Sequence, residues 1–323
     1  MHIHRFEEAP PAGVALALER FERQFTYPLG VGKSFHISHG EDYPCFFRAI
    51  GGIGAGVSFV AEGNDGEILG TLGVAVRPVQ LPGGEVVTSA YLGDLKTAPD
   101  SRRARTLVAL AAKAYSWGRG SGATTAYGVV MDGTPRSPST YSGRFGIPAF
   151  GVVGHVCVLR LPIPANGGEE DAAYEARIET LENRYQVLSV GRFAPLGGGA
   201  EWRSSCEPMF LVTPDGCACG VLEDTRRAKR LLLDEGGEMI SAHLSKFAYS
   251  DVRAGVLILR QALARCRQRT LAPALFVSVP EIDTAAFVRL LGDVPDIIQA
   301  PATVFGAGFA ASHEPWNLST AEI

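Results

Sequence analysis

Residues 86–131 read VVTSAYLGDLKTAPDSRRARTLVALAAKAYSWGRGSGATTAYGVVM, and they show two strand patterns on either side of a helical one. Val86 to Thr97 is rich in the β-branched and aromatic residues that favour strands, and Ala126 to Met131 has the same character. Between them, from about Arg103 to Trp117, aliphatic residues recur at the spacing of an amphipathic helix. A strand, a long crossover helix and a second strand in this order predict a parallel pair in one sheet.

The sequence before this stretch predicts an antiparallel meander. Val57 to Ala61 and Ile68 to Arg77 are rich in strand formers. Short turns follow them at Gly63-Asn64-Asp65-Gly66 and Pro82-Gly83-Gly84, and both contain the glycine that tight hairpins favour. A helical period precedes the meander and consists of Val14, Leu18, Phe21 and Phe25.

The sequence after this stretch repeats the same order of elements. Ser139 to Phe145 predicts a short helix, Phe150 to Leu161 predicts a strand, and a turn-rich linker begins at Pro162. The second half then predicts a helix near Tyr174 to Leu181, strands at Met209–Thr213, Cys217–Glu223, Lys229–Leu233 and Met239–Phe247, a helix over Asp251–Cys266, a strand at Ala274–Val279, a helix over Asp283–Leu291 and a strand at Ile297–Phe305. Repetition of this kind indicates two related domains, which we place at residues 1–163 and 172–316.

Length and composition agree with two globular domains. The chain has 323 residues, which is more than one compact core usually supports, and 46% of them are hydrophobic. Its net charge of −4 gives no basic field for a nucleic acid or an anionic membrane, so we expect small-molecule partners. Residues 1–8 lack a hydrophobic signal region, and no stretch approaches the ~20 apolar residues of a membrane span. A cytoplasmic location is therefore expected.

The element order and two local motifs resemble the GNAT acetyltransferase superfamily. The stretch Tyr91–Arg103 resembles the strand and loop that lead to the superfamily's CoA-binding helix, and Tyr141-Ser142-Gly143-Arg144-Phe145-Gly146-Ile147-Pro148 resembles its short helix. The resemblance covers Val14 to Leu161 in residues, and the second half in element order. It implies an α/β fold of two tandem GNAT-like domains, each a mixed, mostly antiparallel twisted sheet flanked by helices.

The resemblance also implies an acyl-CoA co-substrate, acetyl-CoA in the first instance, and no metal. The residues that it assigns to this ligand are Leu95, Lys96, Thr97, Arg102, Arg103, Ala104, Arg105, Thr106 and Leu107. The superfamily's glycines, which allow backbone N–H groups to approach phosphate closely, are missing here. Three arginines at a helix start are unfavourable unless an anion binds, so we expect their charge to compensate. The alternative is an exposed basic helix start without a ligand.

Two catalytic residues follow from the same resemblance. Tyr141 would protonate the departing thiolate of CoA, and Asp94 would accept the proton of the attacking amine directly or through water. A packed tyrosine and a surface aspartate are the alternatives. A backbone N–H of residues 95–97 would bind the developing oxyanion. In the second half Phe287 stands where the first half has Tyr141, so the second domain lacks the acid and is expected to be structural or to line the acceptor pocket.

Several other sequence patterns are not interpreted as binding sites. The segment Gly30–Ser34 lacks the first glycine of a P-loop, and Gly52–Gly56 precedes a strand instead of joining a strand to a helix. The histidine pairs His2/His4 and His36/His39 lack a third ligand, so no metal site is predicted.

Among the remaining titratable residues, His155 and His243 are expected to be core or pocket residues. We interpret the six scattered cysteines as reduced thiols. The charged run Glu223–Arg230 is expected to be a solvated face, or alternatively to meet a charged acceptor at the domain junction.

The sequence therefore predicts an acyl-CoA-dependent N-acyltransferase that acts on a small-molecule amine, with the chemistry in the first domain. Two alternatives stay open: a non-catalytic acyl-CoA-binding or regulatory protein, and an acyltransferase that uses a carrier-protein thioester. The acceptor, the acyl length and the assembly are not determined by the sequence, and a homodimer is one arrangement compatible with it.

Overall fold

The computed structural model describes residues 1–28, 34–40, 43–51, 55–99, 103–134, 137–164, 173–310 and 314–323. The first half contains the strands β1 (His2–Phe6), β2 (Thr26–Pro28), β3 (Ser34–Ser38), β4 (Gly56–Glu62), β5 (Ile68–Gln80), β6 (Val86–Thr97), β7 (Thr125–Met131) and β8 (Gly151–Pro162). Its helices are α1 (Ala12–Glu22), α2 (Tyr43–Gly51), α3 (Arg103–Gly120) and α4 (Pro138–Tyr141).

The second half has a matching set of elements. Its strands are β9 (Tyr174–Glu175), β10 (Ala194–Pro195), β11 (Met209–Val212), β12 (Ala218–Glu223), β13 (Arg230–Leu233), β14 (Ala242–Tyr249), β15 (Ala274–Pro280) and β16 (Ile298–Ala307). Its helices are α5 (Ile178–Leu188), α6 (Ala200–Arg203), α7 (Val252–Gln268) and α8 (Thr284–Leu290), with short 3-10 turns η1 (Thr225–Arg227), η2 (Glu281–Asp283) and η3 (Thr320–Glu322).

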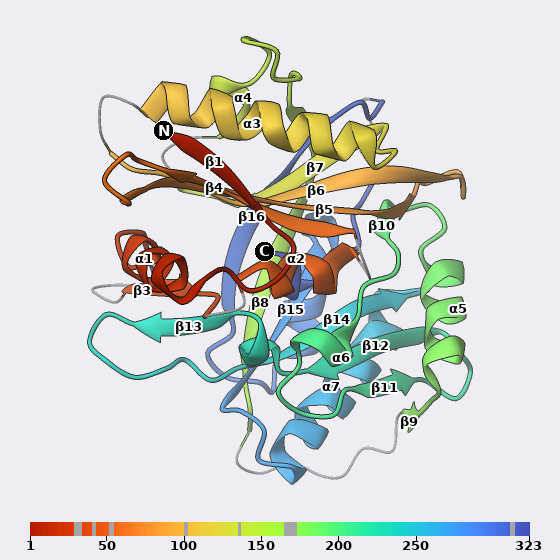
Figure 1. Cartoon of the computed structure of the whole chain (residues 1–323). Helices are drawn as coiled ribbons and strands as arrows, with labels where there is room; N and C mark the ends of the chain where they lie inside the picture. The colour runs from red at the N-terminus through yellow and green to blue at the C-terminus, as the bar shows by residue number, and fades with distance from the viewer. Residues whose placement is uncertain are drawn as a thin grey trace.

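The predicted meander and crossover are confirmed. Strands β4, β5 and β6 pair antiparallel in sequence order, and β6 pairs parallel with β7 through the crossover helix α3. The second half repeats this arrangement, because β11, β12 and β14 pair antiparallel and β14 pairs parallel with β15. Figure 1 shows α3 covering one face of the first half's strands, while α1 and α2 lie on the other face.

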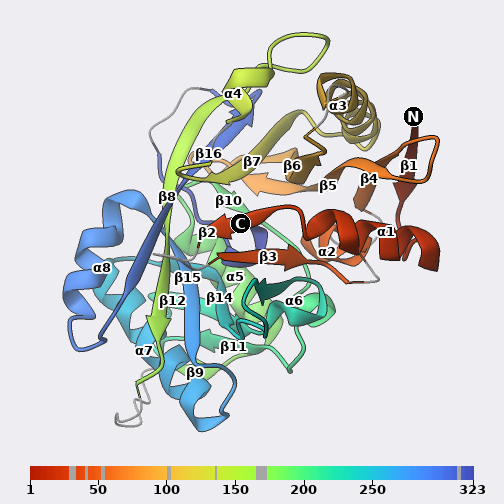
Figure 2. The same cartoon turned by 90° about the vertical axis from the view of Figure 1, so that its left-hand side faces the viewer.

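The halves exchange their last strands. Strand β16 lies between β7 and β8, and β8 also pairs with β15. One continuous sheet results, in the order β1-β4-β5-β6-β7-β16-β8-β15-β14-β12-β11-β9, with β10 added to β5. A small second sheet, β13-β3-β2, also joins the two halves. Figure 2 shows β8 and β16 running side by side through the middle of the molecule.

The predictions for two segments need correction. The helix predicted near Tyr174 to Leu181 begins only at Ile178, because Tyr174 and Glu175 pair with β11 and extend the sheet instead. The charged run Glu223–Arg230 is not a solvated face, since Glu223 is fully buried and Asp224 and Lys229 are almost so. Tertiary burial has overridden the local pattern at both places.

The C-terminal residues, to which the sequence assigned no element, are part of the core. Trp316 is fully buried and donates its Nε1–H to the carbonyl oxygen of Val153 at 2.9 Å. Its ring lies against β8 at Gly154, where a Cβ atom would come within 2.3 Å of the Trp316 Cδ1 atom. Glu322 is also buried, and its Oε1 lies 2.5 Å from Nη1 of Arg77 on β5. The segment 314–323 therefore holds the two halves together.

Of the remaining expectations about single residues, that of free thiols is confirmed for the described cysteines, and that for His155 is wrong. Cys157, Cys219 and Cys266 are buried free thiols, and Cys206 and Cys217 are free and partly buried. His155 is exposed, so the prediction of a core or pocket position is wrong for it. Within the part of the chain that the structure describes, no helix is both long and apolar enough to cross a bilayer.

Candidate active site

Strand β6 carries a bulge at the predicted catalytic position. Gly93 pairs with Gly73 and Lys96 pairs with Thr71, so Leu72 alone faces both Asp94 and Leu95. Asp94 has a φ of 54°, in the left-handed region that Asp tolerates better than most residues. The hydroxyl of Thr71 donates to the carbonyl oxygen of Asp94 at 3.0 Å and holds the bulge in place. Bulges of this kind re-aim side chains and backbone N–H groups.

The bulge lies where β6 and β7 separate. Their parallel pairing covers Ser89–Tyr91 and Thr125–Tyr127, whereas β6 continues to Thr97 and β7 to Met131 along β16. Gly128 stands just beyond the last pair, and a Cβ there would lie 2.8 Å from the carbonyl oxygen of Leu92. The two strands are in close contact at Leu92 and Gly128, and the bulge at Asp94 lies just beyond this point.

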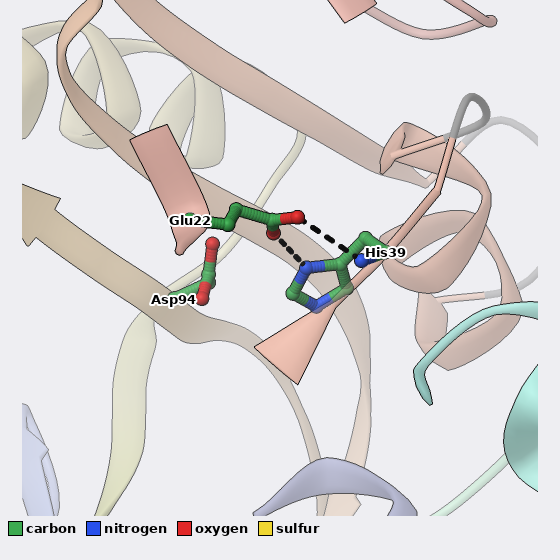
Figure 3. Close-up of side chains that lie close together, drawn as sticks. All are labelled: Glu22, His39 and Asp94. Carbon is green, nitrogen blue, oxygen red and sulfur yellow. Dashed lines mark hydrogen bonds and ion pairs between the residues drawn. The ribbon is translucent and has the colours of Figure 1, made fainter. Parts of the chain in front are cut away.

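A buried cluster of ionisable groups lies on the α1 side of β6. Nζ of Lys96 is 2.5 Å from Oδ1 of Asp94 and 3.7 Å from Oε1 of Glu22. The same Glu22 oxygen is 2.5 Å from Nδ1 of His39, and the backbone N–H of His39 donates to Oε2 at 3.2 Å. Figure 3 shows the two Glu22–His39 contacts with Asp94 beside them. Three separate elements, α1, the end of β3 and β6, thus bring their polar side chains together.

Charges of opposite sign balance one another in this cluster. Burial lowers the pKa of Lys96, but the carboxylates of Asp94 and Glu22 outweigh burial and raise it above its ordinary value. Burial is the main cause of the raised pKa of Tyr27 beside them. Lys229 approaches from the second half, contacts the carbonyl oxygen of Ile323, and lies 5.8 Å from the ring centroid of Phe46. Burial lowers the pKa of Lys229 to about 8.

The same cluster has the donor types of a metal site. One ligand atom from each of Glu22, His39 and Asp94 lies within 4.8 Å of the other two. However, the ammonium of Lys96 already lies 2.5 Å from Asp94 and 3.7 Å from Glu22, where it opposes a second cation. We therefore interpret the cluster as an ion-pair network. The pair His36/His39 contributes only His39 to it.

The residues predicted to bind the acyl-CoA fall into three groups. Leu95 packs against the hydrophobic cluster that includes Leu110 and Ala114 of α3, while Lys96 and Thr97 are buried. Arg102 lies outside the described residues, as does the side chain of Arg103.

At the start of α3, Ala104 and Arg105 are exposed, Thr106 is buried and Leu107 is partly buried. Arg105 lines an open hollow of about 430 Å³ together with Met1, Asn64 and Asp65. Of the basic residues at the start of α3, Arg105 thus faces outward.

Tyr141 is the last residue of α4, which follows β7. The side chain is partly buried, and burial raises its pKa to about 12. With this pKa the hydroxyl of Tyr141 is protonated throughout the neutral range. Figures 1 and 2 place α4 at the same end of the molecule as α3.

The second half contains an equivalent bulge, whose backbone N–H is hydrogen-bonded within the chain. Cys219 pairs with Ala248 and Val221 pairs with Ser245, so Gly220 faces both Lys246 and Phe247, and Lys246 has a φ of 46°. The backbone N–H of Lys246 donates to the hydroxyl of Ser319 at 3.1 Å.

The helix that follows this bulge is also capped from within the chain. At the start of α7 the carboxylate of Asp251 accepts from the backbone N–H groups of Arg253 and Ala254. The second half thus satisfies internally the backbone N–H of Lys246 at the bulge and the first N–H groups of α7.

Three further residues of the second half that the sequence singled out, Phe287, His243 and Glu223, are buried. Phe287 is fully buried, and its ring lies against Tyr249 with centroids 5.2 Å apart. His243 contacts the hydroxyls of Ser241 and Thr320, and burial lowers its pKa to about 4. Glu223 receives two hydrogen bonds from Arg203, at 2.7 and 2.8 Å, within the buried junction of the two halves.

Comparison with known proteins identifies the fold. The sequence matches no protein-family model, and no curated protein matches it. Among solved structures, Saccharomyces cerevisiae N-myristoyltransferase with bound myristoyl-CoA superposes with a TM-score of 0.61 at 10% identity, over 98% of this chain and 84% of that one. A GCN5-related N-acetyltransferase from Anabaena variabilis gives a TM-score of 0.51 at 12% identity, over 94% of this chain and 72% of that one. The chain therefore shares the fold of these two proteins, and its halves repeat one arrangement of elements, as the element order predicted.

Proposed function

We propose that the protein is an acyl-CoA-dependent N-acyltransferase whose chemistry takes place in the first domain, residues 1–163. The observation that carries this proposal is the bulge at Asp94. It stands where β6 and β7 separate, with the start of α3 on one side and the buried cluster of Glu22, His39, Asp94 and Lys96 on the other. We propose that the thioester binds where the two strands separate, between a cofactor side and an acceptor side.

The backbone near the bulge supplies the polar contacts for the acyl group. A backbone N–H of Leu95, Lys96 or Thr97 binds the oxyanion that forms when the amine attacks the thioester. The diphosphate of CoA binds at the start of α3, where Arg102, Arg103 and Arg105 add positive charge to the helix dipole. The adjoining positions Ala104, Thr106 and Leu107 complete this cofactor segment.

Two side chains complete the reaction. Tyr141 donates its proton to the leaving thiolate, and burial raises the pKa of its hydroxyl to about 12. Asp94 is the carboxylate that meets the acceptor amine and draws off its proton directly or through water. The positive charge in the cluster comes from Lys96, and no metal enters this scheme.

The second domain, residues 172–316, is proposed to form a wall of the acceptor site. The hydroxyl of Ser319 accepts the backbone N–H of Lys246 at the bulge, and the carboxylate of Asp251 accepts the first N–H groups of α7. Both groups are therefore unavailable to a second acyl-CoA. Lys229 of the second half interacts electrostatically with Asp94 and Lys96, so that half brings a charge to the acceptor side.

The chemistry of the solved neighbours supports an acyl-CoA donor. The yeast protein was solved with myristoyl-CoA, and the Anabaena protein is described as an N-acetyltransferase. We propose acetyl-CoA as the donor and a small-molecule amine as the acceptor. A longer acyl chain and a peptide amine are the competing donor and acceptor.

Thiol release and binding stoichiometry test the proposal together. Purified protein is titrated calorimetrically with acetyl-CoA and myristoyl-CoA, and then incubated with each thioester and a panel of small amines and peptides bearing a free amino terminus. We expect one thioester bound per chain, and release of CoA thiol that depends on an amine. Binding without amine-dependent release would instead support an acyl-CoA-binding protein. Absence of binding to either thioester would overturn the proposal.

A further inference from the structure

A second open hollow lies beside β13, the strand of the second half that pairs with β3 of the first. Its volume is about 570 Å³, within the ~300–1,000 Å³ range of small-molecule sites. We call it the arginine hollow, and it is lined by Ser204, Ser205, Arg226, Arg227, Arg230 and Glu238. None of these residues belongs to the proposed acyl-CoA site.

Two of its arginines are held by carboxylates through one edge of the guanidinium. Nε and Nη2 of Arg226 donate to the carboxylate of Asp224 at 2.8 and 2.6 Å. Nε and Nη2 of Arg230 donate to the carboxylate of Glu238 at 2.9 and 2.8 Å. Both pairs leave the Nη1 group of the arginine outside the contact, so each fixed guanidinium still has N–H donors for a ligand.

In both pairs the guanidinium is the more exposed partner. The side chain of Arg226 is 34% exposed against 4% for Asp224, and that of Arg230 is 49% exposed against 19% for Glu238. Hydrogen bonds to Asp224 are the main cause of the raised pKa of Arg226, and the positive charge of Arg230 opposes this rise. The two arginines are therefore close enough to repel each other, and an anion bound beside both would offset that repulsion.

Arg227 adds a third guanidinium to the arginine hollow. This residue is exposed, and among the residues that the structure describes none forms a hydrogen bond or an ion pair with its guanidinium. Three guanidiniums thus face the carboxylates of Asp224 and Glu238 alone, which leaves the arginine hollow with excess positive charge. The whole chain has a net charge of −4, so this basic character is local.

Backbone contacts hold the arginine hollow in shape. The backbone N–H of Asp224 donates to the hydroxyl of Ser204 at 3.1 Å, and the backbone N–H of Ser205 donates to the carbonyl oxygen of Asp224 at 2.7 Å. The loop after α6 is thereby joined to the segment that carries the arginines. Lys229 of the same segment is buried instead and contacts the carbonyl oxygen of Ile323. A site preformed in this way needs little ordering when a ligand binds.

We infer that the arginine hollow binds the phosphate group of a small phosphorylated molecule. A guanidinium presents a planar fork of N–H donors that matches the oxygens of phosphate. A phosphate ester has three terminal oxygens and can accept from Arg226, Arg227 and Arg230 together, whereas a carboxylate has only two oxygens. The negative net charge of the chain argues against a nucleic-acid backbone as the source of the phosphate. This site does not depend on the proposed function.

Phosphate binding is measured with the full chain at pH 7 and constant ionic strength. Inorganic phosphate, glycerol 3-phosphate and succinate are titrated in turn, and the Kd is obtained from the rise of the melting temperature with ligand concentration. We expect both phosphates to bind saturably, and succinate to bind at least about tenfold more weakly. Arg227→Met should weaken phosphate binding by about tenfold or more, because a charge-assisted contact is lost. The matched control is Arg253→Met, an exposed arginine on α7, which should keep the wild-type Kd.

A repeat of the titration with acetyl-CoA present separates the arginine hollow from the proposed acyl-CoA site. We expect the Kd for phosphate to be unchanged. Loss of phosphate binding in the presence of acetyl-CoA would assign the phosphate to the CoA site and overturn the inference, as would phosphate binding that Arg227→Met leaves intact. Succinate binding as tightly as phosphate, or no saturable binding of any of the three, would also overturn it. A wild type that binds phosphate but no thioester would contradict the proposed function and leave the arginine hollow as a phosphate site.

Discussion

Nζ of Lys96 lies 2.5 Å from Oδ1 of Asp94, which is two positions earlier on the same strand, β6. Alternate residues of a strand share a face, so the bulge can bring both side chains into the cluster that Glu22 enters from α1. All three side chains are 6% exposed or less. Such a buried network is stable only while its charges remain paired.

Removing the positive charge should therefore destabilise the protein. We expect Lys96→Met to lower the free energy of unfolding by about 3–5 kcal/mol, because Asp94 and Glu22 then remain buried with their negative charges uncompensated. Urea denaturation monitored by circular dichroism measures this change. Lys113→Met provides the control, since Lys113 is exposed on α3 and its replacement should change stability by less than about 0.5 kcal/mol. Equal effects of the two variants would contradict the ion-pair interpretation.

Tyr141→Phe should separate catalysis from binding. Loss of the hydroxyl removes the acid for the thiolate, so we expect the rate of thiol release to fall by ~10²–10⁴ while the Kd for acetyl-CoA is unchanged. Because its pKa is about 12, Tyr141 itself should not produce an ionisation in the rate profile between pH 6 and 9. Tyr115→Phe, an exposed tyrosine on α3, should retain the wild-type rate. A Tyr141→Phe rate within a few-fold of the wild type would exclude Tyr141 as the acid.

Lys229 should impose a pH dependence on stability. Its pKa is 10.5 in the unfolded chain, and burial lowers it to about 8 in the folded protein. Between pH 8 and 10.5 the unfolded state therefore binds more protons, so this group makes the free energy of unfolding rise with pH. Below pH 8 its burial costs roughly 3 kcal/mol. We expect Lys229→Met to be more stable than the wild type at pH 7, with the difference shrinking toward pH 10.5. A pH-independent difference in urea denaturation would contradict the assignment.

Much of the fold could be predicted because its signal is local. The periods of strands and helices in residues 57–161 and 209–305 lie within single segments, and the matching order in the two halves indicated the tandem arrangement. The exchange of β8 and β16 could not be predicted, because periodicity does not say which strand an edge will pair with. The short β9 was interpreted as part of a helix for the same reason.

The residues of the candidate site could likewise be predicted only in part. Asp94 could be found from its place on a strand that resembles a family motif, but Lys96 was noted for its backbone alone. Glu22 belongs to a helix whose apolar period marks only Leu18 and Phe21, and its partner His39 follows a strand that the sequence did not reveal. These residues lie far apart in the chain, and only the packing of α1 and β3 against β6 brings them together.

The buried C-terminal segment offers a last test through a single methyl group. A Cβ added to Gly154 on β8 would lie 2.3 Å from Cδ1 of Trp316, which is fully buried and cannot move without a cavity opening behind it. We expect Gly154→Ala to lower the free energy of unfolding by about 1–3 kcal/mol and to change the fluorescence of Trp316. Gly151→Ala, on the same strand, is the control, because a Cβ there meets nothing within 4 Å. Since Glu322 contacts Arg77 and Ile323 contacts Lys229, displacement of Trp316 should also disturb the acceptor side and lower turnover more than acetyl-CoA binding. Wild-type stability and turnover in Gly154→Ala would show that the segment 314–323 can shift without consequence for the site.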